Sequence, residues 1–127
     1  MKFENFPEKT LDHHLGHELI SIETDYVKSK LVITDNHKQP MGVVHGGTYA
    51  SLSETVCSYG ANYDQLGTFV GVNNNTDFIK SASSGDLICE ARPISKGNTY
   101  QLWECKIFNN DILCAVSKVR LQKKTKF

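Results

Sequence analysis

Alternating hydrophobic and polar positions predict several strands in this chain. Val27 and Leu31 alternate with lysines, a pattern typical of a strand with one buried face. Trp103 likewise lies on the opposite face of its segment from Glu104. We predict strands at 18–24, 26–34, 69–80, 87–95, 99–108 and 112–121, of which the one at 69–80 is polar in its middle.

Turn residues separate these strands. Asp25 and the run 109–111 (Asn-Asn-Asp) indicate tight connections, and strands joined by hairpins pair antiparallel. Near the start of the chain, residues 8–16 predict a short helix that Thr10 caps and Gly16 ends.

Residues 39–63 form a loop that is broken by proline and glycine and leads into a long helix at 46–63. Small and apolar residues occur on every side of this helix, which is typical of a buried one. Glu54 is the only Asp, Glu, Lys or Arg in the whole segment. We therefore expect a buried carboxylate, with its pKa raised by desolvation.

This order of elements predicts a single α+β domain over residues 1–127, with an antiparallel sheet packed on one long helix. One helix leaves other surfaces of the sheet uncovered, so we expect a homo-oligomer. Lys and Arg number 14 and balance 14 Asp and Glu, which argues against a nucleic-acid partner. No apolar run reaches membrane-spanning length and no signal segment is recognisable, so we expect a soluble, cytoplasmic protein.

The cysteines and clustered histidines predict no metal site. Four cysteines occur, none in a CxxC pair, and their apolar surroundings indicate reduced core residues. A Cys57 nucleophile stays open as an alternative, although no base stands at helical spacing from it. The spacing of His13, His14 and His17 does not match a zinc-binding helix motif.

The start and middle of the long helix carry the candidate chemistry. His45-Gly46-Gly47 stands at the helix N-terminus, where free N–H groups can hold a developing oxyanion, or where the glycines simply permit a tight turn. Glu54 can act as a general base or nucleophile, or be a structural carboxylate. Ser58 lies on the same face four residues later, and the amide of Gln39 can donate and accept.

The spacing within the helix separates these groups. At 1.5 Å per residue, Glu54 lies roughly 12 Å from Gly46 along the axis. One helix therefore cannot bring both to the same carbonyl, whereas two antiparallel helices across a two-fold axis can. We expect an active site shared between two subunits.

The pattern Gln39-Pro-x-Gly-x-x-His45-Gly-Gly-x6-Glu54-x3-Ser58 resembles the hotdog-fold acyl-CoA thioesterases, in the branch of 4-hydroxybenzoyl-CoA, 1,4-dihydroxy-2-naphthoyl-CoA and phenylacetate-pathway enzymes. The resemblance implies five to six strands wrapped around the helix, and dimers that pair into tetramers. It implies an acyl-CoA substrate of aromatic or medium size and no separate cofactor. Gly46, aided by His45 and Gln39, would polarise the thioester carbonyl, while Glu54 attacks it or activates water and Ser58 supports hydrolysis.

The resemblance also implies the contacts to coenzyme A. They would fall on Gly71, Phe78, Ile79, Lys80, Ser81, Ser95, Lys96, Gly97, Asn98, Thr99 and Tyr100. Phe78 and Thr99 stand where relatives often carry His and Arg. Two alternatives stay open at this point: a non-catalytic acyl-CoA-binding regulatory domain, and a hydratase or dehydratase of the same fold.

Overall fold

The computed structural model describes residues 5–125, and the ends of the predicted domain, residues 1–4 and 126–127, lie outside them. The elements in chain order are α1 (Leu11–Leu15), β1 (Glu18–Glu23), β2 (Tyr26–Val32), a 3-10 turn (Asp35–His37), α2 (Gly46–Tyr63), β3 (Thr68–Phe78), β4 (Asp86–Lys96), β5 (Tyr100–Asn109) and β6 (Ile112–Lys124). Thr10 caps α1 by accepting from the N–H of His13, and Gly16 ends it in a left-handed conformation.

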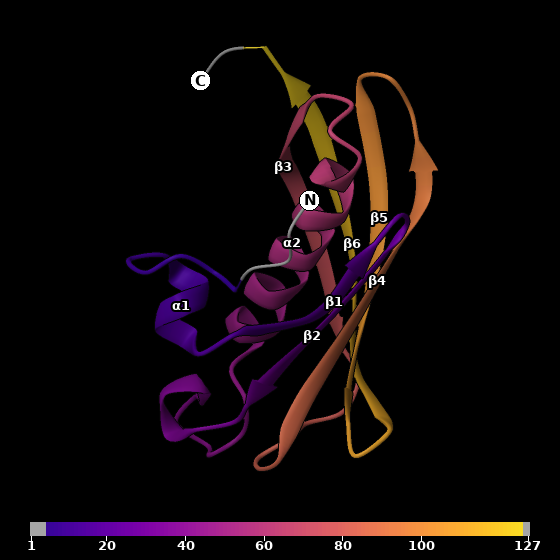
Figure 1. Ribbon diagram of the computed structural model, residues 1–127. Coiled ribbons are helices and arrows are strands. Elements are labelled where there is room, and N and C mark those ends of the chain that lie inside the picture. The colour runs from indigo at the N-terminus through magenta and orange to yellow at the C-terminus, as the bar shows by residue number, and fades with distance from the viewer. Residues whose placement is uncertain (1–4, 126–127) are drawn as a thin grey trace.

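All six strands form one antiparallel sheet in the order β1-β2-β4-β5-β6-β3. The sheet curves around α2, which contacts every strand (Figure 1). The β5–β6 hairpin turns through Asn110 and Asp111, both at positive φ, the geometry that suits the right-handed twist of paired strands. Strands β1 and β3 form the two edges of the sheet.

The core lies between α2 and the concave face of the sheet. The helix buries a stripe of paired positions, Thr48, Tyr49, Leu52, Ser53, Val56, Cys57, Gly60 and Ala61. Large, fully buried side chains of the sheet meet this stripe: Trp103, Leu31, Leu87, Ile107 and Leu121. The spacing repeats every three to four residues, so one face of α2 packs on the sheet and the other faces away from it.

The convex face of the sheet carries charged side chains interspersed with apolar ones such as Ile88 and Phe108. Residues of opposite charge pair between neighbouring strands β4 and β5, Glu90 with Lys106 and Arg92 with Glu104. Such cross-strand pairs suit a face turned to solvent. Gly46 and Glu54, the main candidates for chemistry, lie on α2 at the other side of the sheet.

Candidate active site

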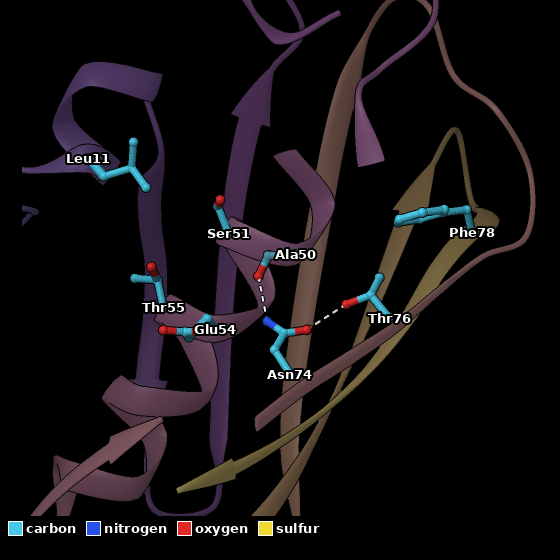
Figure 2. Close-up of a pocket in the computed structure, with 8 residues that line it drawn as sticks. All are labelled: Leu11, Ala50, Ser51, Glu54, Thr55, Asn74, Thr76 and Phe78. Atoms are coloured by element: carbon cyan, nitrogen blue, oxygen red, sulfur yellow. Dashed lines mark hydrogen bonds between the residues drawn. The ribbon is translucent and has the colours of Figure 1, made fainter. Parts of the chain in front are cut away.

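A pocket of about 450 Å³ lies between α1, the exposed face of α2 and β3 (Figure 2). Eight residues line it: Leu11, Ala50, Ser51, Glu54, Thr55, Asn74, Thr76 and Phe78. Glu54 is the only one of the eight with an ionisable side chain. The pocket thus joins one carboxylate to a largely uncharged lining.

Glu54 is exposed, so the expectation that it is buried within the chain is wrong. The reason is that small uncharged residues occupy both faces of α2, and the pattern of hydropathy did not separate the face on the sheet from the free face. The carboxylate packs against Gly71, where an added Cβ would lie 3.3 Å from its Cδ. Within residues 5–125 no hydrogen bond or ion pair engages it. Only a second chain or a substrate could remove water from this group.

The strand under Glu54 is irregular. The pairing of β3 with β6 shifts between Gly71 and Asn73, which leaves Val72 as an extra residue. Such bulges bend a strand and are frequent beside active sites. Here the bulge, together with the missing side chain of Gly71, makes room for the carboxylate.

A polar wall of hydrogen-bonded side chains on β3 lines the same pocket as Glu54 and was not predicted. The side-chain amide of Asn74 donates to the carbonyl of Ala50 at 2.9 Å, and its oxygen accepts from Thr76 at 2.7 Å (Figure 2). The Thr76 hydroxyl also lies 2.7 Å from Ser117 Oγ. The available signal was the run of asparagines in β3, a residue that strands disfavour.

A second pocket of about 240 Å³ lies at the N-terminus of α2. Its lining comprises Gln39, Val43, Val44, Gly46, Tyr49, Phe78, Ile79, Lys80 and Ser81. Phe78 lines both pockets and so lies between them. A Cβ added at Gly46 would lie 2.4 Å from this ring, so any side chain at Gly46 would have to displace the ring.

The helix N-terminus offers a free donor in this pocket. His45 caps α2 with Nδ1, which accepts from the N–H of Gly47 at 2.7 Å, so a neutral His45 carries its proton on Nε2. The N–H of Gly46 belongs to the first turn and has no acceptor within residues 5–125. The Gln39 side-chain oxygen accepts from the N–H of Met41, and its NH₂ group donates to nothing in the described chain. Free N–H donors therefore gather here.

Ser58 is not joined to Glu54. Its side chain is half-buried on α2, and its carbonyl accepts from the Asn62 amide at 2.8 Å. Within residues 5–125 no hydrogen bond connects the two side chains. Cys57 is fully buried, and burial raises the pKa of its thiol, so the structure does not support a Cys57 nucleophile.

The residues expected to contact coenzyme A lie in two separate places. Residues 78–81 follow β3 beside the start of α2, whereas residues 95–100 form the β4–β5 hairpin at the other end of the sheet (Figure 1). The strand registers show the same separation: Phe78 pairs with Ala115 and Tyr100 pairs with Gln122, and these two partners lie at opposite ends of β6. One chain therefore does not bring the two groups together.

Lys96 already has partners within the chain. Its ammonium contacts Asp25 at 2.7 Å and Asp64 at 2.8 Å, and these hydrogen bonds raise the pKa of Lys96. This ion pair ties the β1–β2 turn and the end of α2 to β4. Lys80, by contrast, is exposed at the rim of the second pocket.

A six-stranded antiparallel sheet wrapped around one long helix, with a glycine-bearing helix start and a pocket carboxylate, defines the hotdog thioesterase class. The chain belongs to this class: the model of the thioesterase superfamily matches residues 41–116. It is thus a thioester hydrolase, in agreement with the named enzymes that it resembles.

Individual relatives cover most of the chain. A Mycobacterium tuberculosis protein named as a candidate esterase is 37% identical over 87% of this chain and 84% of its own. Its solved structure has a TM-score of 0.86 over 91% of this chain and 97% of that one. A 1,4-dihydroxy-2-naphthoyl-CoA hydrolase of Listeria monocytogenes is 29% identical over 91% of this chain and 97% of that protein. A Staphylococcus aureus thioesterase structure has a TM-score of 0.84 at 28% identity, covering 90% of this chain and 98% of that one.

Two further findings concern residues 5–125. None of the helices there is both long enough and apolar enough to cross a membrane. No three side chains of His, Cys, Asp or Glu lie close enough together there to hold a metal ion. His17 instead bonds Asp12 and Ser29.

Proposed function

We propose that this enzyme hydrolyses an acyl-CoA, with an aromatic or medium-size acyl group, to the free acid and coenzyme A. The observation that carries the proposal is a carboxylate, Glu54, on the same helix as the N–H at its start, Gly46, neither of which has a hydrogen-bond partner within residues 5–125. The reaction uses no cofactor, since coenzyme A is part of the substrate. We further propose that the enzyme acts in the cytoplasm.

Each group has a role in the reaction. The N–H of Gly46, with Nε2–H of His45 and the NH₂ of Gln39, stabilises the oxyanion that forms on the thioester carbonyl. Glu54 either takes a proton from water as the water oxygen bonds to the carbonyl carbon, or attacks that carbon to form an anhydride that water then cleaves. In both routes the carbon–sulfur bond breaks and the thiolate of coenzyme A leaves. Ser58 supports the hydrolytic step.

Similar proteins support the role of Glu54 and Gln39. Structures of the Staphylococcus aureus thioesterase include variants with alanine in place of a glutamate and of a glutamine. Those two residues have the same separation in that protein as Gln39 and Glu54 have here. Relatives named 1,4-dihydroxy-2-naphthoyl-CoA hydrolase support an aromatic acyl group.

The reaction requires two chains. Glu54 and Gly46 are roughly 12 Å apart along α2, and they line different pockets on either side of Phe78. A two-fold axis that sets two α2 helices antiparallel would bring Glu54 of one chain to Gly46 of the other. The exposed edge of β3, eleven residues long, is free to pair with a second copy beside α2. We infer a dimer of this kind, with dimers pairing into a tetramer.

Coenzyme A then contacts both chains. The arm next to the thioester would be held by four residues of the second pocket, Phe78, Ile79, Lys80 and Ser81, and by Gly71, which lies against Glu54. The exposed ammonium of Lys80 would meet a phosphate. The hairpin residues Ser95, Lys96, Gly97, Asn98, Thr99 and Tyr100 would contact the nucleotide end from the other chain. Lys96 would do so only by sharing its ammonium with Asp25 and Asp64.

The test is the release of free thiol from benzoyl-CoA and hexanoyl-CoA. Glu54→Gln keeps the shape of the side chain and removes its charge, so kcat should fall about a thousandfold. Glu23→Gln, an exposed carboxylate on β1 away from both pockets, is the matched control and should keep wild-type activity. No thiol release by the wild type, or equal release by Glu54→Gln, would overturn the proposal.

A further inference from the structure

We propose that Leu11, on α1, is a specificity-determining residue that contacts the acyl group of the substrate, and that Asp12 holds it in place. The inference rests on the proposed function and deepens it. It assigns the apolar end of the substrate to the pocket beside Glu54. It also gives the short helix α1 a role that the catalytic groups do not require.

Leu11 is an apolar side chain left largely in solvent. Helix α1 buries none of its own residues, and Leu11 is 59% exposed. Yet it extends from α1 toward the same pocket as Glu54 (Figure 2). An apolar group bound there would remove Leu11 from water, which favours substrates with a bulky apolar acyl group. Phe78 and Ala50 supply other apolar parts of the lining.

Asp12 fixes the position of α1. One carboxylate oxygen accepts from His17 Nδ1 at 2.9 Å, and the other accepts from the hydroxyl of Thr55 at 2.9 Å. Thr55 is the neighbour of Glu54 on α2. A helix of five residues is not stable alone, so the position of Leu11 relative to Glu54 depends on these bonds together with the packing of Leu15 on the core.

These hydrogen bonds of Asp12, which we call the anchor of α1, continue into the core through His17. His17 Nε2 lies 2.7 Å from Ser29 Oγ on β2, and the ring of Phe6 packs on His17 at 4.8 Å. Ser29, His17 and Asp12 have the connectivity of a serine-hydrolase triad. Ser29 is 0% exposed and lines neither pocket, so this arrangement positions α1 and does not attack a substrate.

The first experiment measures kcat/KM of Leu11→Ala for acetyl-CoA, hexanoyl-CoA and benzoyl-CoA. The two larger substrates should lose about tenfold, the order of effect expected for lost apolar contact, while acetyl-CoA changes less than about twofold. Because Leu11 is exposed in the free protein, the melting temperature should not change. Ile94→Ala, a similarly exposed apolar residue on β4 that lines neither pocket, is the control.

The second experiment tests the anchor. Thr55→Val keeps the shape of the side chain and removes its hydrogen bond to Asp12. It should lower kcat/KM for hexanoyl-CoA in the wild-type background but have no further effect in Leu11→Ala, because the anchor acts through Leu11. If Thr55→Val caused a loss of the same size in both backgrounds, Thr55 would act on its neighbour Glu54 and not through Leu11. That result would contradict the positioning role of Asp12.

Binding separates this inference from the proposed function. S-hexyl-coenzyme A, a thioether that cannot be hydrolysed, should bind Leu11→Ala about tenfold more weakly than wild type by calorimetry. Leu11-dependent binding without any hydrolysis by the wild type would refute the thioesterase proposal and leave the acyl contact standing. Equal binding by both proteins, or equal losses with acetyl-CoA and hexanoyl-CoA, would overturn the role of Leu11.

Discussion

The phenol oxygen of Tyr49 is buried against the sheet and has no hydrogen-bond partner within residues 5–125. Burial raises the pKa of Tyr49 to about 12, so the hydroxyl keeps its proton at neutral pH. A buried hydroxyl without a partner costs about 1–3 kcal/mol, because it gives up its bonds to water. Tyr49 is therefore a site of unfavourable free energy beside the second pocket.

Tyr49→Phe should raise the free energy of unfolding by about 1 kcal/mol, since it removes the unpaired oxygen and keeps the ring. Urea denaturation of the ligand-free protein measures the change. Tyr26→Phe is the matched control: that hydroxyl donates to Glu90 at 2.8 Å, so the same chemical change should give no gain. A loss of stability in Tyr49→Phe would mean that the hydroxyl has a partner that residues 5–125 do not supply.

The sequence predicted which residues are candidates for the site, but it did not predict whether their side chains are buried or exposed. Glu54 and Gly46 stand out in the sequence because a lone charge and paired glycines are unusual at these points of a helix. The exposure of Glu54 depends on which face of α2 meets the sheet, and small uncharged residues on both faces hide that choice. The wall formed by Asn74 and Thr76 was missed because its meaning depends on the carbonyl of Ala50, on another element.

At the scale of elements, α2 packs tightly against the sheet at Gly60. A Cβ built there would lie 2.4 Å from the ring of Trp103, a fully buried residue of β5. The indole is held in place, because its N–H donates to Gln101 at 2.7 Å. Neither partner can therefore move away cheaply.

Gly60→Ala should lower the free energy of unfolding by about 1–3 kcal/mol, because overpacking against Trp103 outweighs the better helix propensity of alanine, which is worth about 1 kcal/mol. Thermal or urea unfolding measures it. Ser51→Ala, on the free face of the same helix, should change stability by less than about 0.5 kcal/mol. A more stable Gly60→Ala protein would show that propensity dominates and that the indole adapts.

The elements themselves were largely predictable, and their ends were not. Alternation and turn residues predicted strands such as β4 and β5 because one face of each is buried, whereas the edge strand β3 has a polar middle and buries only Phe69. Strand β6 extends to Lys124, beyond the predicted 121, because its polar end pairs with the start of β3. Helix α1 is shorter than the predicted 8–16, because Thr10 already caps it and none of its side chains is buried. The ends of helices and strands depend on caps and on pairing partners, and the hydropathy pattern carries no information about either.

At the scale of the whole molecule, the two halves of the chemistry lie in separate pockets of one chain. Gly46→Pro removes the N–H of Gly46 and leaves the carboxylate of Glu54 in place. Proline suits the first position of a helix, and His45, at φ −66 and ψ 136, already has the extended conformation that precedes proline. The ring would displace only the far end of the exposed Phe78 side chain. Gly46→Pro and Glu54→Gln should each be inactive alone.

Co-expressing the two inactive variants should restore activity if the site is shared. In a hybrid dimer, one site combines both changed residues, while the other combines Gly46 of one chain with Glu54 of its partner and is intact. Random pairing makes half of the dimers hybrid, so about one quarter of wild-type thiol release should return. The control is to purify the two variants separately and mix them only for the assay. Without exchange of chains between dimers, this mixture gives the background rate of thiol release. Hybrid dimers that form but stay inactive would place both groups of a working site on one chain.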